Sequence, residues 1–513
     1  MRGVVAAGHE NTAWAAEMML REGGNAFDAI VAAQVAACAA EPMLTSLGGG
    51  GFLLAKPAGE RPMVFDFFVH TPRHKRPPEA LDLRSIEVDF GAARQAFHIG
   101  CGTIATPGCV KGMFEIHRRL CRMPMRELCA PAIEFAREGA RMNDLLAYIA
   151  SVVHPIYTAS ETTRAIFAGS GPDGRLVVGD VVRQPALVDV LESLAIEGED
   201  LFYRGEIARL IARECEQHGG LLTQEDLEHY RVELREPLIT NYRDVKVMSN
   251  PPPSSGGILI AFALKLLDKT AIGSHPFGSV AHLHLLANAM RLTQKARIDT
   301  LLASGYLDAE RLLDEGYLAS YRRQIAGRTS ASRGTTHISV IDQAGNVAAL
   351  SCSNGEGCGV IVPKTGIMLN NMLGEDDLSP HGLHGWLEDQ RMTSMMAPSI
   401  VLRPNAEVIA TGSGGSNRIR TAILQVLINL IDFRLDVETA VCSPRIHLEG
   451  ERLSLEGALD SEKLKSWLST FPEHEIWPAL NLFFGGVHTV MSADGKFQGA
   501  GDPRRGGVSR VIA

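Results

Sequence analysis

The 513-residue sequence contains no run of five or six basic residues, and its 50 Lys and Arg are outnumbered by 59 Asp and Glu. The formal net charge is therefore −9. Proteins that bind nucleic acid through its phosphates need clustered positive charge. We expect no nucleic-acid partner.

Long apolar runs are also missing. The most apolar window, 29–40, is shorter than the ~20 residues that span a bilayer, so we expect a buried helix there and no membrane partner. The N-terminus lacks the uninterrupted apolar segment of a signal peptide, because Glu10, Glu17, Arg21 and Glu22 interrupt it. We therefore expect a cytoplasmic location.

The sequence lacks recognisable metal-ligand spacing. Its nine cysteines are odd in number and include no CxxC pair, and the four from Cys101 to Cys129 fit no zinc pattern. His282 and His284 are two residues apart, so they do not face one site on a helix. We expect free thiols in a reducing compartment, and no metal or organic cofactor.

Composition and patterning indicate a globular α+β protein. The 45% hydrophobic and 21% charged residues are typical of soluble domains. Apolar spacing predicts helices near the N-terminus and through most of 110–330, whereas alternation predicts strand hairpins in 52–68 and in the C-terminal third. The latter include an apolar strand at 360–369 with a turn at Lys364 to Gly366. Paired strands in both ends of the chain suggest two stacked sheets with helices outside.

Three loops interrupt this pattern. The stretch from Asn250 to Ile258, NPPPSSGGI, predicts a rigid loop, and 327–337 is typical of a flexible polar linker. The glycine run Gly48 to Gly51 precedes a strand and does not open a helix, so it fails the context of a phosphate-binding loop. A close backbone crossing is the better interpretation of that run.

Thr335 stands where the polar linker meets a predicted strand. If the chain were cut before it, its free α-amine, with a pKa near ~8, could accept the proton of its own hydroxyl and activate it as a nucleophile. The same pattern also fits an ordinary strand start, because threonine favours strands. Pattern alone leaves both interpretations open.

The segment GSGGS, Gly412 to Ser416, precedes a predicted helix. Its consecutive backbone N–H groups would suit an oxyanion or another anionic group at a helix start. A tight strand-to-helix turn with no ligand explains the same glycines.

Together, several stretches resemble the γ-glutamyltranspeptidase family of N-terminal-nucleophile hydrolases, whose precursors cut themselves into a large and a small subunit. The resemblance covers nearly the whole chain. The stretches are REGGNAFDA at 21–29, EPMLTSLGGGGFLL at 41–54, ATPG at 105–108, PPPSSGG at 251–257, TTHISVIDQAGN at 335–346, TGIMLNN at 365–371, and GSGGS.

The resemblance implies an αββα four-layer fold and cleavage after Gly334, giving fragments 1–334 and 335–513 that share one core. It implies that Thr335 is the autoprocessing and catalytic threonine. Ser353 matches a second hydroxyl that supports the nucleophile, and Gly414 with Gly415 match the oxyanion-hole glycines. No cofactor is implied.

The resemblance also implies donor-binding residues. Asp377 is similar to the acid that holds the α-amino group of a glutamyl donor, with Asp376 as the alternative. Thr393 and Ser394 match a hydroxyl pair that contacts the donor carboxylate, and Asn354 matches an asparagine that touches it, although the loop 353–359 is shorter than in the family.

The main departure lies in 66–72, DFFVHTP. The family has an arginine there that clamps the donor α-carboxylate, and Phe68 stands in its place. A charge-assisted guanidinium–carboxylate hydrogen bond contributes roughly 1.5–3 kcal/mol, which phenylalanine does not replace. Arg73 and His70 are the candidates to compensate.

The resemblance therefore implies an acyl-transferring threonine hydrolase acting on a small-molecule amide or peptide. A γ-glutamyl amide such as glutathione is the first substrate class. The alternative is an acylase of the cephalosporin-acylase type with a non-glutamyl substrate, and a third alternative is an unprocessed, non-catalytic binding homologue. The two fragments would be each other's partners, and a homodimer is one assembly that the sequence allows.

Overall fold

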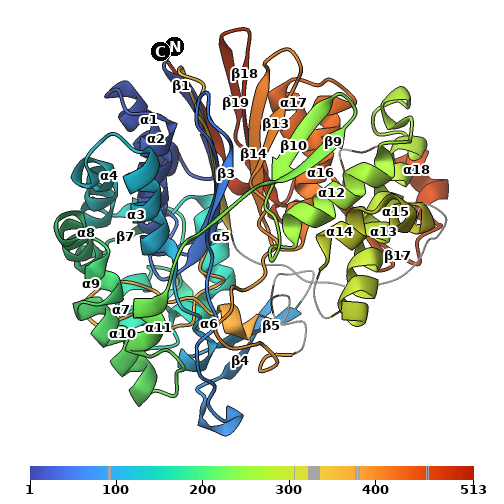
Figure 1. The fold of residues 1–513 in the computed structure, drawn as a ribbon. Helices are drawn as coiled ribbons and strands as arrows, with labels where there is room; N and C mark the ends of the chain where they lie inside the picture. Colours follow the sequence, from blue (N-terminus) through green and yellow to red (C-terminus); the bar gives the residue numbers. More distant parts are fainter. Residues whose placement is uncertain are drawn as a thin grey trace.

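The computed structural model describes residues 1–89, 94–304, 307–321, 335–375, 378, 382–457, 459 and 461–513. Two antiparallel sheets lie face to face in the centre, with helices on both outer sides (Figure 1). The α+β, four-layer αββα arrangement expected from the sequence is confirmed.

The first sheet has seven strands, and the strand that follows Thr335 lies in its interior. In spatial order it consists of β20 (Val508–Ile512), β1 (Gly3–Ala7), β11 (Thr336–Asp342), β12 (Val347–Ser353), β2 (Gly50–Lys56), β3 (Met63–Phe67) and β8 (Glu233–Arg235).

The second sheet has six strands and packs against the first through β14 and β18. In spatial order it consists of β19 (Lys496–Ala500), β18 (Gly486–Ala493), β14 (Val408–Gly414), β13 (Ser399–Leu402), β10 (Val245–Ser249) and β9 (Leu238–Tyr242). Both sheets therefore combine strands from before and after Thr335, as a core shared by the two expected fragments requires.

Helices cover both outer faces. On the first sheet lie α1 (Glu10–Arg21), α2 (Ala26–Ala40) and α3 (Cys109–Leu120), and α4 (Met125–Glu138) packs on the outside of α2. Every residue of α2 is buried, and Asn25 and Asp28 form its capping box, so the prediction of a buried helix at 29–40 is confirmed. The second sheet is covered by α12 (Gly256–Leu267) and α16 (Arg418–Ile431), and α13 (Val280–Ser304) packs on α12.

Shorter elements complete the layers. The remaining helices are α5 (Asp144–Val152), α6 (His154–Tyr157), α7 (Glu161–Phe167), α8 (Pro185–Glu197), α9 (Asp200–Tyr203), α10 (Glu206–Gln217), α11 (Gln224–His229), α14 (Ala309–Leu313), α15 (Glu315–Tyr321), α17 (Val437–Cys442) and α18 (Ser461–Leu468). The remaining strands are β4 (Arg84–Asp89), β5 (Arg94–Ile99), β6 (Ala140–Arg141), β7 (Val181–Val182), β15 (Ile446–Glu449), β16 (Arg452–Glu456) and β17 (Glu473–Trp477).

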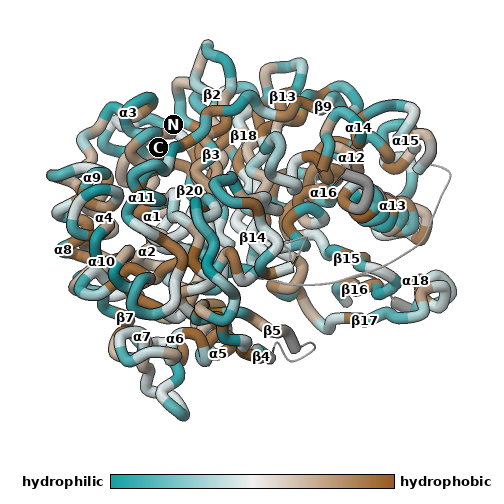
Figure 2. Tube along the Cα trace, turned by 60° about the horizontal axis from the view of Figure 1, so that its bottom comes forward, coloured by the Kyte–Doolittle hydropathy of each residue, from teal (hydrophilic) through white to brown (hydrophobic). Residues whose placement is uncertain are grey.

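Hydrophobic segments gather inside, around the two sheets and along α16, while the outer turns are mainly hydrophilic (Figure 2). None of the described helices combines the length and the apolar character needed to cross a bilayer. All nine cysteines are free, and the described part of the chain holds no group of three His, Cys, Asp or Glu that could bind a metal ion.

Two local predictions are wrong. The loop predicted for 250–258 ends at Ser255, because α12 already begins at Gly256, where a Cβ would come within 2.1 Å of the Met395 carbonyl oxygen. The strand predicted for 360–369 is reduced to isolated bridges, Ile361 with Met368 and Gly48 with Leu369. The turn predicted within it, at Lys364 to Gly366, is present and is closed by the Thr365 N–H, which donates to the Val362 carbonyl oxygen at 3.2 Å. Most of the predicted linker, residues 327–334, lies outside the described residues.

Candidate active site

Thr335 directly precedes β11 and is buried, with 5% of its surface exposed. The antiparallel register pairs Thr336 with Cys352, so Thr335 and Ser353 are the next residues along two neighbouring strands. Both line one open pocket. The structure thus brings the expected nucleophile and its supporting hydroxyl together.

That pocket has an empty volume of about 370 Å³. Its wall is mainly apolar, and Glu375 is its one ionisable side chain among the described residues. The lining consists of Phe68, Thr335, Ser353, Met372, Glu375, Leu378, Ser394, Met395, Met396, Ser416 and Ile419. A mainly apolar wall with a few polar groups fits a small acyl group with a few polar contacts.

The glycine turn 412–416 brings the second sheet against Thr335. A Cβ on Gly414 would lie 2.0 Å from the Thr335 carbonyl oxygen, closer than any real contact. Gly415 has φ +120°, a conformation that favours glycine. Glycine is therefore required at 414 by the close approach to Thr335, and at 415 by the backbone conformation. Together they place the turn beside the start of β11.

A hydrogen-bonded serine holds this turn to the next strand. Ser413 Oγ donates to the Gly414 carbonyl oxygen at 2.7 Å and accepts from the Gly486 N–H at 3.1 Å. Gly486 begins β18, which pairs with β14 along its whole length. The backbone of Gly414 is therefore fixed from behind as well as by the sheet.

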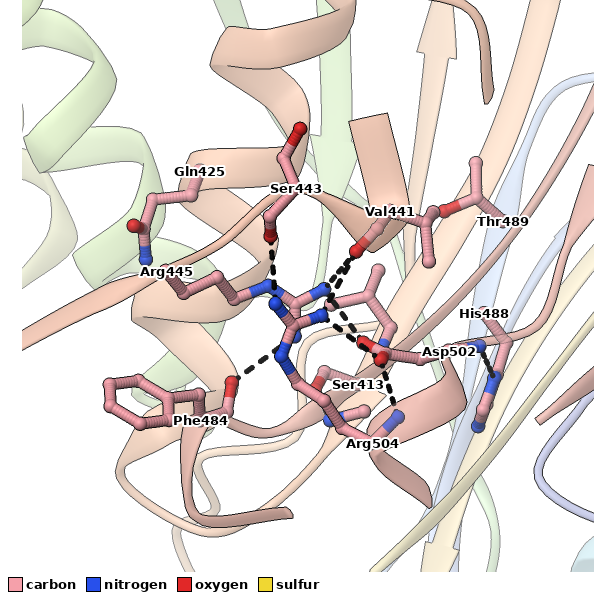
Figure 3. Close-up of polar contacts among 12 residues, drawn as sticks. Ser413, Gln425, Val441, Ser443, Arg445, Phe484, His488, Thr489, Asp502 and Arg504 are labelled. Atoms are coloured by element: carbon pink, nitrogen blue, oxygen red, sulfur yellow. Dashed lines mark hydrogen bonds and ion pairs between the residues drawn. The ribbon is translucent and has the colours of Figure 1, made fainter. Parts of the chain in front are cut away.

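A buried network of charges lies beneath the turn (Figure 3). Arg445 pairs with Asp502 at 2.7 Å, and Arg504 pairs with Glu456 at 2.5 Å and with Asp502 at 3.2 Å. Asp502 also accepts from the Val487 N–H at 2.8 Å. Burial by itself would raise the pKa of Asp502, but the two guanidinium groups outweigh it and the pKa lies below its usual value.

Polar contacts also anchor the head of β11 to the helical layer. Thr336 Oγ1 donates to Glu41 at 3.0 Å, and the same carboxylate accepts from Thr12 at 2.6 Å. His337 bonds Ser351 at 2.8 Å and Ser339 at 2.9 Å, and burial holds its pKa well below the usual value. His337 is therefore neutral at physiological pH.

The PPPSSGG segment positions one wall of the pocket. The Ser394 carbonyl oxygen accepts from the Ser255 N–H at 2.8 Å, the Gly256 N–H at 3.1 Å and Ser254 Oγ at 2.9 Å. These bonds fix the backbone of Ser394, which lines the pocket together with Met395 and Met396. Thr393, the other member of the expected hydroxyl pair, is half-buried and is not among the lining residues.

Asn370, in the stretch TGIMLNN, is hydrogen-bonded to the stretches EPMLTSLGGGGFLL and ATPG. Its side-chain amide donates to the carbonyl oxygens of Gly48 at 2.8 Å and Ala105 at 2.9 Å, and its oxygen accepts from the Ala105 N–H at 3.1 Å. A Cβ on Gly49 would lie 2.3 Å from the Ser353 carbonyl oxygen, so the expected close backbone crossing is confirmed. These motifs form the scaffold around β12.

Phe68 points into the pocket and stacks on Phe52, with ring centroids 5.4 Å apart. Neither candidate to compensate for it lines the pocket: Arg73 and His70 both approach Asp389, at 3.3 and 3.5 Å. Among the described lining residues there is no Lys or Arg. The described wall therefore offers no cation to a carboxylate.

The remaining expected binding residues either do not line the pocket or lie outside the described residues. Asn354 is fully buried and is not among the lining residues. Asp376, Asp377 and Gly334 lie outside the described residues. Sequence reasoning missed Glu375, although it stands in the same acidic run, GEDD at 374–377, and that run was the available signal.

Comparisons with known proteins agree over the whole chain. The sequence profile described as Gamma-glutamyltranspeptidase matches residues 12–512. The chain is 32% identical to a glutathione hydrolase proenzyme of Escherichia coli, covering 95% of this chain and 87% of that protein. It is 31% identical to an acylase ACY 1 proenzyme of Pseudomonas sp. (strain SE83), covering 100% and 94%.

The fold is that of N-terminal-nucleophile hydrolases. A solved cephalosporin acylase from Bacillus halodurans superposes with a TM-score of 0.84 at 25% identity, over 99% of this chain and 95% of that one. The matching profile and the relatives at this level of identity lead to one assignment, with which the pocket lined by Thr335 and Ser353 is consistent. The chain belongs to the gamma-glutamyltranspeptidase family of enzymes.

Proposed function

We propose that this protein is a self-processing threonine hydrolase that cleaves or transfers the acyl group of an amide. The observation that carries the proposal is the position of Thr335, which directly precedes β11, lines a pocket together with Ser353 and lies against Gly414. Cleavage after Gly334 would free the α-amine of Thr335. One residue would then supply both nucleophile and base.

In the proposed reaction, Thr335 Oγ attacks the amide carbonyl carbon while its α-amine takes the hydroxyl proton. The N–H groups of Gly414 and Gly415 stabilise the resulting oxyanion, and Ser353 supports the nucleophile. Collapse of the intermediate breaks the C–N bond, and the α-ammonium returns the proton to the leaving amine. Water or a second amine then attacks the acyl-enzyme, and Thr335 is regenerated.

A γ-glutamyl amide is the first candidate substrate. The E. coli relative is named a glutathione hydrolase, and the pocket of this chain holds a carboxylate, Glu375, that would pair with a donor α-ammonium group. Ser394 in the same wall offers a hydroxyl to the donor carboxylate. In this proposal Glu375 has the role that the family resemblance assigned to Asp377, namely holding the donor α-amino group.

An acyl group without the glutamate α-carboxylate is the second candidate. It is favoured by Phe68, which occupies the place of the carboxylate clamp, and by the absence of Lys and Arg from the described lining. The relative named acylase ACY 1 and the solved cephalosporin acylase are consistent with such a substrate.

Three anilides that differ in one group each separate these candidates: γ-glutamyl, glutaryl, which lacks the amino group, and butyryl, which lacks both charges. The highest kcat/KM for the γ-glutamyl anilide supports the first candidate. The highest value for butyryl supports the second. No turnover of any anilide by a processed enzyme would contradict the proposed pocket.

The substitution Phe68→Arg tests the clamp directly. We expect kcat/KM for the γ-glutamyl anilide to rise about tenfold or more, because one charge-assisted hydrogen bond contributes roughly 1.5–3 kcal/mol. The butyryl anilide gains nothing by this change. Phe68→Leu is the matched control for lost ring volume, and a processed Phe68→Arg enzyme with no gain would count against Phe68 as the substituted clamp.

A further inference from the structure

Arg505 is a buried cation without a partner. Its side chain is 5% exposed, it makes no hydrogen bond or ion pair with any residue that the structure describes, and its Nε is buried without a partner. The adjacent Arg504 pairs with Glu456 and Asp502. Buried charges are normally paired, so an unpaired guanidinium calls for a functional explanation.

The guanidinium lies against the glycine turn. Arg505 Nη1 is 3.4 Å from the position that a Cβ would take on Gly414, and Nη2 is 3.3 Å from the corresponding position on Gly415. The Gly414 position is also 2.0 Å from the Thr335 carbonyl oxygen. Arg505 therefore sits beside Thr335 as well as beside both glycines.

Packing holds the side chain in that place. A Cβ on Gly486 would lie 2.3 Å from Arg505 Cδ, so only glycine at the start of β18 leaves room for the aliphatic stem. Burial lowers the pKa of Arg505 to about 10, and the group still carries its charge at neutral pH. The position of this charge is therefore fixed.

Four other ionisable groups lie near the Arg505 side chain, namely Asp502, Glu41, Arg418 and His488. Asp502 is committed to Arg445 and Arg504, and Glu41 accepts hydrogen bonds from Thr12 and Thr336. Arg418, at the start of α16, adds positive charge, and the pKa of His488 is lowered to about 4 by burial, so that His488 is neutral.

Two further titratable groups face Thr335 itself. Glu375 lines the pocket, and His337, the second residue along β11, is neutral because burial lowers its pKa. Glu41 and Glu375 are negatively charged, so they favour a positive charge at Thr335, whereas Arg505 disfavours one. Neither forms an ion pair with it among the described residues.

We propose that Arg505 is a positioning residue that acts through its charge, favouring the neutral, proton-accepting form of the Thr335 α-amine. The inference rests on the proposed function, because that amine exists only after cleavage at Thr335. An ammonium ion there would be repelled by the guanidinium, and a neutral amine would not. A base must be unprotonated to accept the hydroxyl proton.

The sign of the effect follows from this charge. Turnover rises with pH as the α-amine loses its proton, so the acidic limb of the kcat/KM profile reports the pKa of that amine. Removing the positive charge stabilises the ammonium form and moves the limb to higher pH. For a neighbouring unit charge in a partly buried site, we expect a shift of about one pH unit.

The test compares pH profiles of processed wild type, Arg505→Met and Arg505→Lys with one anilide. Arg505→Met is expected to move the acidic limb upward by about one unit, and Arg505→Lys to leave it close to wild type. Glu41→Gln is expected to move it in the opposite direction. Arg126→Met, which removes an exposed charge on α4, is the control and leaves the limb unchanged.

A variant that fails to cleave itself is measured as the mature enzyme. For this, residues 1–334 are co-expressed with residues 335–513 behind a removable initiator methionine. An Arg505→Met enzyme that keeps the wild-type limb would overturn the proposal, and so would an Arg505→Lys enzyme that shifts as much as Arg505→Met. In either case, the proposed function still holds if the wild-type enzyme turns over the anilide and this turnover depends on Thr335.

Discussion

Thr335→Ala is expected to reduce turnover of every acyl anilide by about 10⁴-fold or more, because it removes the nucleophile of a covalent mechanism. Thr335→Ser keeps a hydroxyl and is expected to retain measurable turnover. The measurement is kcat for the two variants and wild type, with the uncleaved fraction determined by denaturing gel.

The fold should survive both changes. The Thr335 side chain borders an open pocket and is not part of the apolar core, so circular dichroism and the thermal midpoint are expected to stay near wild type. Turnover by a purified, folded Thr335→Ala chain within tenfold of wild type would show that another residue carries the chemistry.

Gly414→Ala is expected to have the second-largest effect. Its Cβ would lie 2.0 Å from the Thr335 carbonyl oxygen, so β14 and β11 must move apart and the turn must shift. Loss of one oxyanion donor lowers kcat by about 10²- to 10³-fold, and overpacking at a rigid contact destabilises by about 1–3 kcal/mol.

Gly316→Ala provides the matched control, because Gly316 is exposed in α15 and its nearest neighbour is the flexible Asp314 side chain at 3.1 Å. The measurements are kcat, KM and the free energy of unfolding of both variants. A Gly414→Ala enzyme with wild-type kcat would exclude the turn from the reacting centre, whatever its stability.

The layers of the fold could be predicted from the sequence because their signals are periodic. Alternation around AGN at 344–346 predicted the β11–β12 hairpin, and the Asn25–Asp28 cap with its alanine-rich helix predicted α2. The segments 250–258 and 360–369 were mispredicted because their conformation is set by tertiary contacts. Gly256 packs on Met395, and 361–369 bridges to Gly48 and to itself.

The neighbouring positions of Thr335 and Ser353 could be predicted, whereas the pocket around them could not. Thr335 follows from a hydroxyl at a strand head and from family resemblance, and Ser353 follows from family resemblance alone. Glu375 and Arg505 acquire their positions only when distant segments meet, and neither is marked by a spacing in the sequence. A cytoplasmic location and a homodimer stay predictions.

The central claim is that the chain cuts itself before Thr335. The most direct measurement is the intact mass of the purified wild type, with N-terminal sequencing of the smaller fragment. The account predicts two fragments that remain associated, 1–334 and 335–513, the second beginning Thr-Thr-His. A wild-type chain that stays whole while it hydrolyses anilides, or a cut at another residue, would contradict it.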